Sequence, residues 1–407
     1  MLDLRDGRCS EGCLFARPTD DDATHARPRN AAPPMTAITD ARWHALRISP
    51  KTTWCFVELV DDQGRIGIGE ATLNGRERLV HDAFARLSCP LAGRSAGGID
   101  WSSARKVAST LAEFAAISAL DQATRDLAAR QRNASVATTL GPILRESIPV
   151  YANINRGTLD RSPAGFALRA RDAVVDGFAA IKVAPFDEVA LHGDATLAID
   201  TDALDAGLAR IVAVREAVGP AVDLMVDCHW RLNLAAAQRV LAALDACKLY
   251  WLECPVPETP EMLDTIRAIR RDANARGVRL AGCEEMRRVG GFMPFIEAGA
   301  YDVMMPDAKY VGGLDEMLAV AGALARHGMS FSPHNPSGPV CHAASVQVCA
   351  VAPTLDRLEM QYAETPLFDA IVGGHAPRAV DGAIALPRGP GFGVTLDERL
   401  ARELAGG

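Results

Sequence analysis

The segment DLMVDCHW, residues 223–230, is a short apolar run that stops at an acid, Asp227. Apolar runs of this length are too short for helices and are typical of buried strands in a parallel sheet. Four later segments have the same form, and each delivers a polar residue: YWLECP (250–255) delivers Glu253, LAGCEE (280–285) Glu284, YDVMMPDAK (301–309) Asp307, and MSFSPHN (329–335) His334. Because successive parallel strands end at one mouth, we expect these side chains to converge there.

Strand-like and helix-like segments alternate from Ile148 to Gln361. Eight of them are interpreted as strands: IPVYANI, AAIKVAPFD, DLMVD, YWLE, RLAGCEE, YDVMMPD, MSFSPH and RLEMQ. Strict alternation predicts parallel strands joined by right-handed helical crossovers, and eight such strands close a barrel. The predicted fold class is therefore α/β, with a TIM-type (β/α) barrel.

The chain before this barrel has a different pattern. The segment WCFVELVDDQGRIGIGEA (54–71) predicts a hairpin with a DDQG turn, since alternating strand residues flank that turn. The segment LAEFAAISALDQATRDLAARQR (111–132) repeats Ala and Leu at helical intervals and predicts a helix. We expect residues 35–145 to form an α+β domain, and the polar residues 1–34 to be a disordered N-terminal extension.

Composition restricts the class of protein. The 407 residues have 49% hydrophobic content, a formal net charge of −8 and ten cysteines without a framework spacing. The charge argues against a nucleic-acid partner, and no apolar run approaches the roughly 20 residues of a membrane helix. The cysteines predict buried thiols in a reducing compartment. We expect a cytoplasmic protein without a membrane partner, and a homo-oligomer as the default for a barrel enzyme.

Asp227, Glu253 and Glu284 are candidate metal ligands. Each of them read alone is equally consistent with a helix N-cap or a solvated loop acid. Three acids on three consecutive strands are hard to explain in that way, because buried like charges repel strongly and a divalent cation holds them together. The all-oxygen donor set predicts one Mg²⁺, with positions left for water and substrate.

Two histidines are candidate acid–base residues. His229 lies two residues past Asp227, so strand alternation predicts that it faces the same side. His334 ends the seventh strand and Asp307 the sixth, so a carboxylate lies beside an imidazole, as in a general base whose tautomer is fixed. The alternative for His334, which lies in the Pro-rich loop SPHNPSGP, is a structural hydrogen bond.

Lys182 ends the second strand segment, IKVAPFD. Its apolar neighbours argue against a solvated lysine, and we interpret it as a cation that binds a substrate carboxylate. Further polar contacts with substrate, or a donor to developing charge, are expected from residues that follow the first strand and end the eighth: Asn153, Asn155, Arg156 and Glu359.

Together these residues resemble the enolase superfamily, in particular its mandelate racemase branch. The three metal acids, PDAKYVGG with Asp307 and SPHN with His334 carry the resemblance, which runs from about residue 36 to the C-terminus. It implies a modified barrel with the metal site over residues 146–365, an α+β capping domain over residues 35–145, and a segment 366–407 that returns to the capping domain. It also implies one Mg²⁺ and the abstraction of a proton α to a carboxylate.

Two departures narrow the chemistry that the resemblance implies. Racemases of the branch typically carry KxK at the second strand, whereas this chain has Lys182 and Ala184, so the second lysine base is missing. Lys309 does not obviously replace the lysine base of muconate-cycloisomerase-like members, and we place it among the substrate contacts. The Asp227-x-His229 pair instead resembles sugar-acid dehydratases such as galactonate and mannonate dehydratases, in which histidines of the third and seventh strands face opposite sides of the substrate.

The resemblance therefore implies a Mg²⁺-dependent lyase, a hydro-lyase that dehydrates aldonic or aldaric acids in carbohydrate-acid catabolism. His334 would remove the α-proton, Mg²⁺ and Lys182 would stabilise the ene-diolate, and His229 would protonate the departing β-hydroxyl; the two histidines could exchange these roles. An isomerase, either a lactone cycloisomerase or a racemase/epimerase, shares the same ene-diolate. A barrel-fold binding protein without catalysis is the alternative from another class. Specificity is expected in the loops near residues 52–54 and 74–76.

Overall fold

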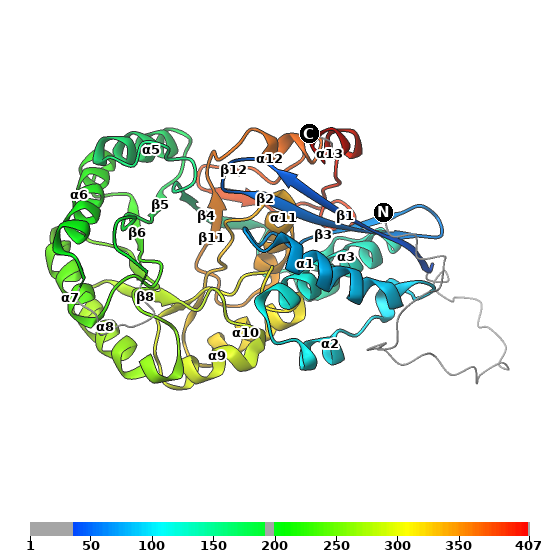
Figure 1. Ribbon diagram of the computed structural model, residues 1–407, viewed down its shortest axis with the longest axis horizontal. Coiled ribbons are helices and arrows are strands. Elements are labelled where there is room, and N and C mark those ends of the chain that lie inside the picture. Colours follow the sequence, from blue (N-terminus) through cyan, green and yellow to red (C-terminus); the bar gives the residue numbers. More distant parts are fainter. Residues whose placement is uncertain (1–35, 192–198, 406–407) are drawn as a thin grey trace.

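The computed structural model describes residues 36–191 and 199–405, so the expected extension over residues 1–34 lies outside the described chain. Figure 1 shows a barrel ringed by helices and, beside it, a smaller domain with a long antiparallel sheet. The sheet has the order β1–β2–β3: β1 (Ile38–Arg47), β2 (Thr53–Asp61) and β3 (Ile66–Glu70). The helical elements of this domain are α1 (Glu77–Ser88), η2 (Cys89–Leu91), η3 (Ala96–Gly98), α2 (Ser102–Val107), α3 (Leu111–Gln131) and α4 (Val136–Leu140). The expected hairpin and helix are therefore present.

Strand β3 lies directly against helix α3, and glycines make this close approach possible. A Cβ atom at Gly67 would lie 2.2 Å from the carbonyl oxygen of Ala123, and one at Gly69 would lie 2.0 Å from that of Ala119. Real Cβ atoms essentially never approach backbone so closely, hence the alternating glycines of IGIGE are required by the contact between sheet and helix.

The barrel of the described chain contains eight parallel strands: β4 (Ser147–Asn153), β5 (Ala180–Val183), β6 (Asp223–Asp227), β7 (Trp251–Glu253), β8 (Arg279–Gly282), β9 (Val303–Met304), β10 (Ser330–Phe331) and β11 (Leu358–Gln361). Consecutive strands pair in parallel from β4 to β10, and β11 pairs with β4. A bridge between Phe331 and Leu355 joins β10 to the chain just before β11, which closes the barrel. The predicted α/β barrel with an α+β capping domain is confirmed.

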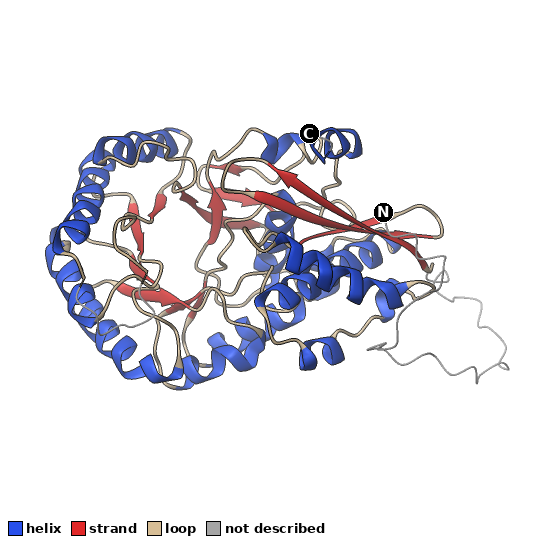
Figure 2. Cartoon of the chain, viewed as in Figure 1, coloured by secondary structure: helices blue, strands red, loops and turns tan. Residues whose placement is uncertain are grey.

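Helices cover the outside of the barrel, as Figure 2 shows. They are α5 (Pro163–Val175), α6 (Thr201–Val218), α7 (Leu234–Ala243), α8 (Leu263–Ala275), α9 (Arg288–Glu297), α10 (Leu314–Arg326) and α11 (Pro339–Val351), with short turns η4 (Asp245–Cys247) and η5 (Pro260–Met262) between strands. Inside, a separate apolar cluster includes Tyr151, Met225, Trp251 and Met305, so the barrel is filled by side chains.

The two ends of the barrel differ. At the end where the strands begin, the ring of Tyr250 lies between the guanidinium groups of Arg279 and Arg357, 4.1 and 4.2 Å from the ring centre. Asp356 bonds to both arginines and to the tyrosine hydroxyl. This ionic and aromatic stack closes one end, which leaves the end where the strands stop for the functional site.

The capping domain is fixed to the barrel by buried polar contacts. Glu70, the last residue of β3, accepts hydrogen bonds from the backbone N–H groups of Gly338 (2.7 Å) and Cys341 (2.9 Å) at the start of α11. Thr52 donates to Glu364, which follows β11, at 2.5 Å. The loop before β2 therefore lies beside the mouth of the barrel.

The chain after the barrel contacts both regions. Its elements are α12 (Leu367–Ala370), β12 (Ala379–Val380), β13 (Ala383–Ala385) and α13 (Glu398–Ala405). Strand β13 pairs antiparallel with β4, and Phe392 donates its N–H to Asp126 of α3 at 2.6 Å. Helix α13 packs beside β1, as Figure 1 also shows.

Among the cysteines of residues 36–191 and 199–405, the expected buried thiols are present with one exception. Seven are free and buried: Cys55, Cys228, Cys247, Cys254, Cys283, Cys341 and Cys349. Cys89 is disulfide-bonded, so the expectation of thiols throughout is wrong at this position. Cys89 is only partly buried, unlike the other seven, and is therefore accessible for pairing. Over residues 36–191 and 199–405, no helix is long and apolar enough to cross a membrane.

Candidate active site

Three acids gather where neighbouring barrel strands end. Asp227 ends β6, Glu253 ends β7 directly opposite it in the register, and Glu284 follows β8 by two residues. One carboxylate oxygen of each lies within 4.8 Å of the others, and all three side chains are buried. We call Asp227, Glu253 and Glu284 the acid cluster. It has the arrangement that is typical of the divalent-metal site of the enolase superfamily.

The charges of the acid cluster fit a bound cation. Burial raises the pKa of Glu253 to about 8, an effect that Lys182 opposes and Asp227 reinforces. Burial also raises the pKa of Glu284 well above its ordinary value, and the carboxylates of Asp227 and Glu253 add to this rise. The donor set is all oxygen, and its surroundings do not neutralise all of its negative charge. Such a set is suited to a hard divalent cation.

Lys182 supplies part of the compensating charge from within the protein. Its ammonium group is 2.5 Å from Glu253 Oε1, 3.0 Å from Glu359 Oε1 and 4.0 Å from Asp227 Oδ2. The side chain is 1% exposed. Burial lowers the pKa of Lys182, but the surrounding carboxylates outweigh burial and raise it well above its ordinary value. Lys182 is therefore a fixed cation between the acid cluster and β11.

His334 and Asp307 form the expected pair. His334 Nδ1 is 2.8 Å from Asp307 Oδ2, and His334 Nε2 is 3.6 Å from Glu284 Oε1. Because an ionised carboxylate only accepts hydrogen bonds, Nδ1 carries a proton, and Nε2 faces the acid cluster. Burial raises the pKa of Asp307, but the charge of Lys309 and the hydrogen bond from His334 outweigh burial, so that the pKa is lowered.

His229 reaches the acid cluster by a different route from the expected one. Strand β6 ends at Asp227, so His229 lies outside the strand and strand alternation does not set its direction. The left-handed backbone of His229, with φ of 46°, places it beside the acid cluster. His229 Nε2 is 2.8 Å from Asp227 Oδ2, and its backbone N–H donates to Asp227 Oδ1 at 2.9 Å. Nearly half of the side chain, 47%, is exposed. Burial lowers the pKa of His229, but Asp227 outweighs burial and raises it.

Each of the remaining candidate residues has a side-chain partner within the protein. Asn153 donates to Glu359 Oε1 at 2.6 Å and accepts from Asn155 at 2.8 Å. Arg156 forms an ion pair with Glu364 at 3.5 Å. Lys309, which is 1% exposed, donates to Ser337 at 2.7 Å and lies 3.1 Å from Asp307. Asn153, Asn155 and Glu359 thus lie in one network with Lys182, whereas Lys309 lies behind Asp307.

Two further residues were not among the candidates: Trp251, which contacts the acid cluster, and Glu258, which contacts residues beside it. The indole N–H of Trp251 donates to Glu253 Oε2 at 2.8 Å from inside the barrel. Residues i and i+2 of a strand share a face, so the spacing of WLE in the sequence contains this signal. Glu258 bonds to Cys283 and Tyr301, far away in the chain, and sequence spacing contains no signal for that contact.

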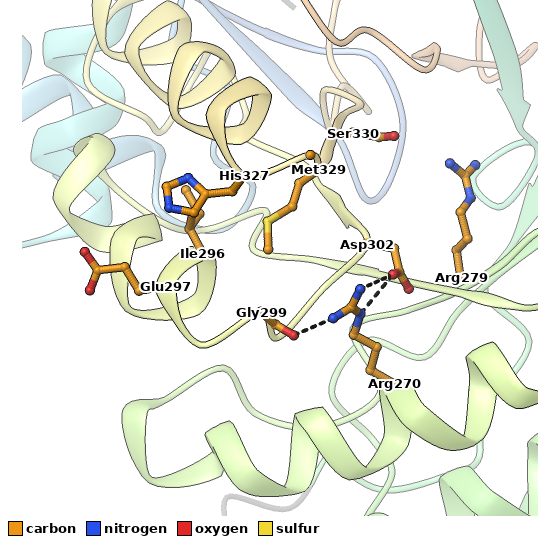
Figure 3. A pocket seen from close by; sticks show the side chains of 10 residues that line it. Arg270, Arg279, Ile296, Glu297, Gly299, Asp302, His327, Met329 and Ser330 are labelled. Carbon is orange, nitrogen blue, oxygen red and sulfur yellow. Dashed lines mark hydrogen bonds and ion pairs between the residues drawn. The ribbon is translucent and has the colours of Figure 1, made fainter.

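A hollow with a volume of about 480 Å³ lies where β8 and β10 begin, at the end of the barrel opposite the acid cluster. Figure 3 shows Arg270 held by the carbonyl of Gly299 and by Asp302, at 2.8 and 2.7 Å. These charges pair with each other, and the hollow lies at the other end of the strands from the acid cluster. We therefore take the acid cluster, and not this hollow, as the candidate active site.

Comparison with known proteins gives a consistent result. Residues 34–141 match the family model described as the mandelate racemase/muconate lactonizing enzyme N-terminal domain, and residues 165–400 match the one described as enolase C-terminal domain-like. A D-gluconate dehydratase of Thermoproteus tenax is 32% identical over 368 residues, which is 89% of this chain and 70% of the relative. A D-galactonate dehydratase of Ralstonia nicotianae is 29% identical over 88% of this chain and 92% of the relative.

Solved structures agree with this result. A mandelate racemase/muconate lactonizing enzyme-like protein of Rubrobacter xylanophilus superposes with a TM-score of 0.81 at 29% identity, over 91% of this chain and 98% of its own. The matched models span both regions of the fold and include the strands that carry the acid cluster. The chain belongs to the mandelate racemase/muconate lactonizing enzyme family of the enolase superfamily.

Proposed function

We propose that this enzyme is a Mg²⁺-dependent dehydratase of sugar acids, a hydro-lyase that acts on aldonic or aldaric acids. The observation that carries the proposal is the pair of histidines at the acid cluster, His334 beside Glu284 and His229 beside Asp227. Dehydration removes one proton from the substrate and delivers another to its hydroxyl, which requires two acid–base groups at one bound substrate. The names of the two dehydratase relatives support the same reaction.

His334 takes the α-proton of the substrate carboxylic acid at Nε2. Asp307 accepts a hydrogen bond from the Nδ1–H group of His334. This bond fixes the tautomer and stabilises the imidazolium that forms. Asp307 stays ionised because Lys309 donates to it through both its backbone N–H and its ammonium group. We therefore assign Lys309 to the support of this pair, whereas the sequence had suggested a substrate contact.

Asp227, Glu253 and Glu284 would hold Mg²⁺, which supplies positive charge for the substrate carboxylate as it takes on ene-diolate character. Lys182 adds a fixed positive charge beside the same carboxylates. His229 gives a proton to the β-hydroxyl as the C–O bond breaks, so that water leaves. The enol that remains tautomerises to a 2-keto-3-deoxy acid. The two histidines could exchange the roles of acid and base.

A small cavity beside the mouth supports a substrate with several hydroxyl groups. The cavity has a volume of about 90 Å³, and Trp54, Gln361 and Glu364 are among the residues that line it. Trp54 Nε1 and Gln361 Oε1 are buried and have no hydrogen-bond partner within the described chain. Most buried polar groups have a partner, and the distal hydroxyls of a sugar acid would supply both a donor and an acceptor here.

The test is a screen of mono- and diacid sugars for the Mg²⁺-dependent formation of keto acids, with products identified by NMR. A 2-keto-3-deoxy acid supports dehydration, a ring-opened or ring-closed isomer supports cycloisomerisation, and an inverted centre supports epimerisation. His334→Asn should abolish exchange of the α-proton with deuterated water. His375→Asn, which changes an exposed histidine in the same way, should leave exchange intact. Exchange retained in His334→Asn would refute the assigned role.

A further inference from the structure

The three turns that carry the acid cluster share an unusual backbone. Four non-glycine residues in these turns have the left-handed conformation: His229 (φ 46°), Trp230 (φ 56°), Cys254 (φ 43°) and Cys283 (φ 72°). Cys254 directly follows Glu253, and Cys283 directly precedes Glu284. L residues rarely adopt this conformation, and it persists where the surrounding structure holds it in place.

Backbone hydrogen bonds join these turns to one another. The N–H of Cys228 donates to the carbonyl of Glu253 at 2.9 Å, and the N–H of Trp230 donates to that of Cys254 at 2.6 Å. The N–H of Cys254 in turn donates to the carbonyl of Ala281 at 3.0 Å. A displacement of one turn therefore changes the other two, and with them the separation of the three carboxylates.

One side chain, Glu258, bonds to the turns after β7 and β8. Its Oε1 accepts from the backbone N–H of Cys283 at 2.5 Å and from the thiol of Cys254 at 3.8 Å. Burial raises the pKa of the same carboxylate overall, whereas the side chain of Trp230, in the turn after β6, acts on it to lower that pKa. The hydroxyl of Tyr301, which lies just before β9, donates to Oε1 at 2.9 Å. Glu258 thus bonds to the residues adjacent to Glu253 and Glu284, the ligands that follow β7 and β8.

The local sequence leaves room for this carboxylate. A Cβ atom at Gly282 would lie 2.3 Å from Glu258 Oε1 and 2.7 Å from the ring of Tyr301. The thiol of Cys254 also lies 3.7 Å from Glu284 Oε2, so it connects Glu258 to the acid cluster itself. Small residues therefore surround the carboxylate at the points where it meets the turns.

We propose that Glu258 is the positioning residue of the metal site: it ties the turns after β7 and β8 together, and the backbone bonds between the turns pass this constraint to the turn after β6, so that Glu258 sets the separation of the Asp227, Glu253 and Glu284 carboxylates. The inference rests on the acid cluster as the place of the metal and requires no particular substrate. Glu258 acts through the backbone of residues beside the ligands. Partners of this kind that orient metal ligands typically change metal affinity by about 10- to 100-fold when they are removed.

The test measures metal binding alone, by titration calorimetry with Mg²⁺ and by the electron paramagnetic resonance of bound Mn²⁺. Glu258→Ala should bind both ions about 10- to 100-fold more weakly than the unmodified protein. Glu258→Gln keeps an oxygen that can accept from Cys283 and Tyr301, so it should recover affinity to within about tenfold. Glu261→Gln changes an exposed acid three residues away and should bind as the unmodified protein does.

The comparison separates positioning from general stability. If Glu258 has only a structural role, metal-free Glu258→Ala should have a lower melting temperature. Its folded fraction should then keep the metal affinity and the Mn²⁺ spectrum of the unmodified protein. That result would overturn the proposal. If Glu258→Ala does not fold, the metal affinities of Tyr301→Phe and Gly282→Ala test the proposal instead. Tyr301→Phe removes a donor to Glu258, and Gly282→Ala places a methyl group where the Glu258 carboxylate lies. Unchanged affinity in both of these variants would also overturn it. Tight metal binding without dehydratase turnover would count against the proposed function and leave this inference standing.

Discussion

Replacing Glu284 with glutamine should stabilise the metal-free protein while it removes the response to Mg²⁺. Carboxylate oxygens of the acid cluster lie within 4.8 Å of one another. At that distance and an effective dielectric constant of about 20, two unit charges repel by about 3.5 kcal/mol. Lys182 contacts Asp227 and Glu253, so its charge offsets the repulsion chiefly at those two acids. Glu284 is therefore the ligand whose charge is least favourable when no cation is bound.

Protonation sets the sign and the pH window of this effect. The pKa of Glu284 is raised well above its ordinary value of 4.5 by burial and by the two neighbouring carboxylates. A raised pKa contributes stability that is present below the unfolded-state value and is lost as pH rises through the folded-state value. Between pH 4.5 and about pH 7 this loss reaches at most about 3 kcal/mol. Glutamine does not titrate, so the advantage of Glu284→Gln should grow as pH rises through this window.

The assay is thermal unfolding from about pH 5 to about pH 8, once with a chelator and once with excess MgCl₂. For a domain of this size, a change of about 1 kcal/mol in the free energy of unfolding shifts the melting temperature by about 2–4 °C. Metal-free Glu284→Gln should melt above the unmodified protein towards the alkaline end, and Mg²⁺ should raise the melting temperature of the unmodified protein only. Glu285→Gln, the exposed neighbour, should behave as the unmodified protein does. A lower melting temperature for metal-free Glu284→Gln at every pH would refute the reasoning, as would equal stabilisation of both proteins by Mg²⁺.

Three further changes test other contacts. Lys182→Met leaves Glu253 and Glu359 without their buried cation and should destabilise the protein by about 3–5 kcal/mol in chemical unfolding, whereas Lys106→Met, at an exposed site, should have little effect. The pKa of Asp61 is about 2, since its hydrogen bonds with Thr36 and Arg65 outweigh burial, so Asp61→Asn should cost about 2 kcal/mol above pH 3.8. That difference should vanish as pH falls through about 2, and a cost independent of pH would contradict the ionic origin; Asp62→Asn is the control. Gly69→Ala places a Cβ atom 2.0 Å from the Ala119 carbonyl and should destabilise the capping domain by about 1–3 kcal/mol or more, measured by hydrogen exchange of β3, while Gly98→Ala meets open space and should be neutral.

The barrel was predictable because its signals are local. Each apolar run is short, each is followed by a helical segment, and the alternation itself specifies parallel strands. The acid cluster followed from the same reasoning, since Asp227 and Glu253 are the last residues of their strands and strands of one barrel end at one mouth. The pairing of His334 with Asp307 was expected for the same reason, because β9 and β10 are neighbours.

Other features depend on contacts between residues that are far apart in the chain. His229 lies beside Asp227, as expected. It does so because of a left-handed turn after β6, whereas strand alternation was the wrong reason. Lys309 was predicted to contact substrate, and the structure adds contacts with Asp307 and Ser337 that its spacing does not reveal. The role of Glu258 could not be inferred from spacing, since its partners Cys283 and Tyr301 lie 25 and 43 residues away.

From the order of its residues alone, this chain specifies an eight-stranded barrel with acids and histidines at one mouth, because strand length, apolar runs and alternation are properties of neighbouring residues. Tertiary structure decided which of those groups touch: the Lys182 ammonium between Glu253 and Glu359, the Nε2 atoms of His334 and His229 beside the acid cluster, and Glu258 between the turns after β7 and β8. The physical reason is that burial and distances of a few ångströms between distant segments set the charge balance and the geometry of a metal site, and these arise only when the barrel closes and the capping domain packs against it.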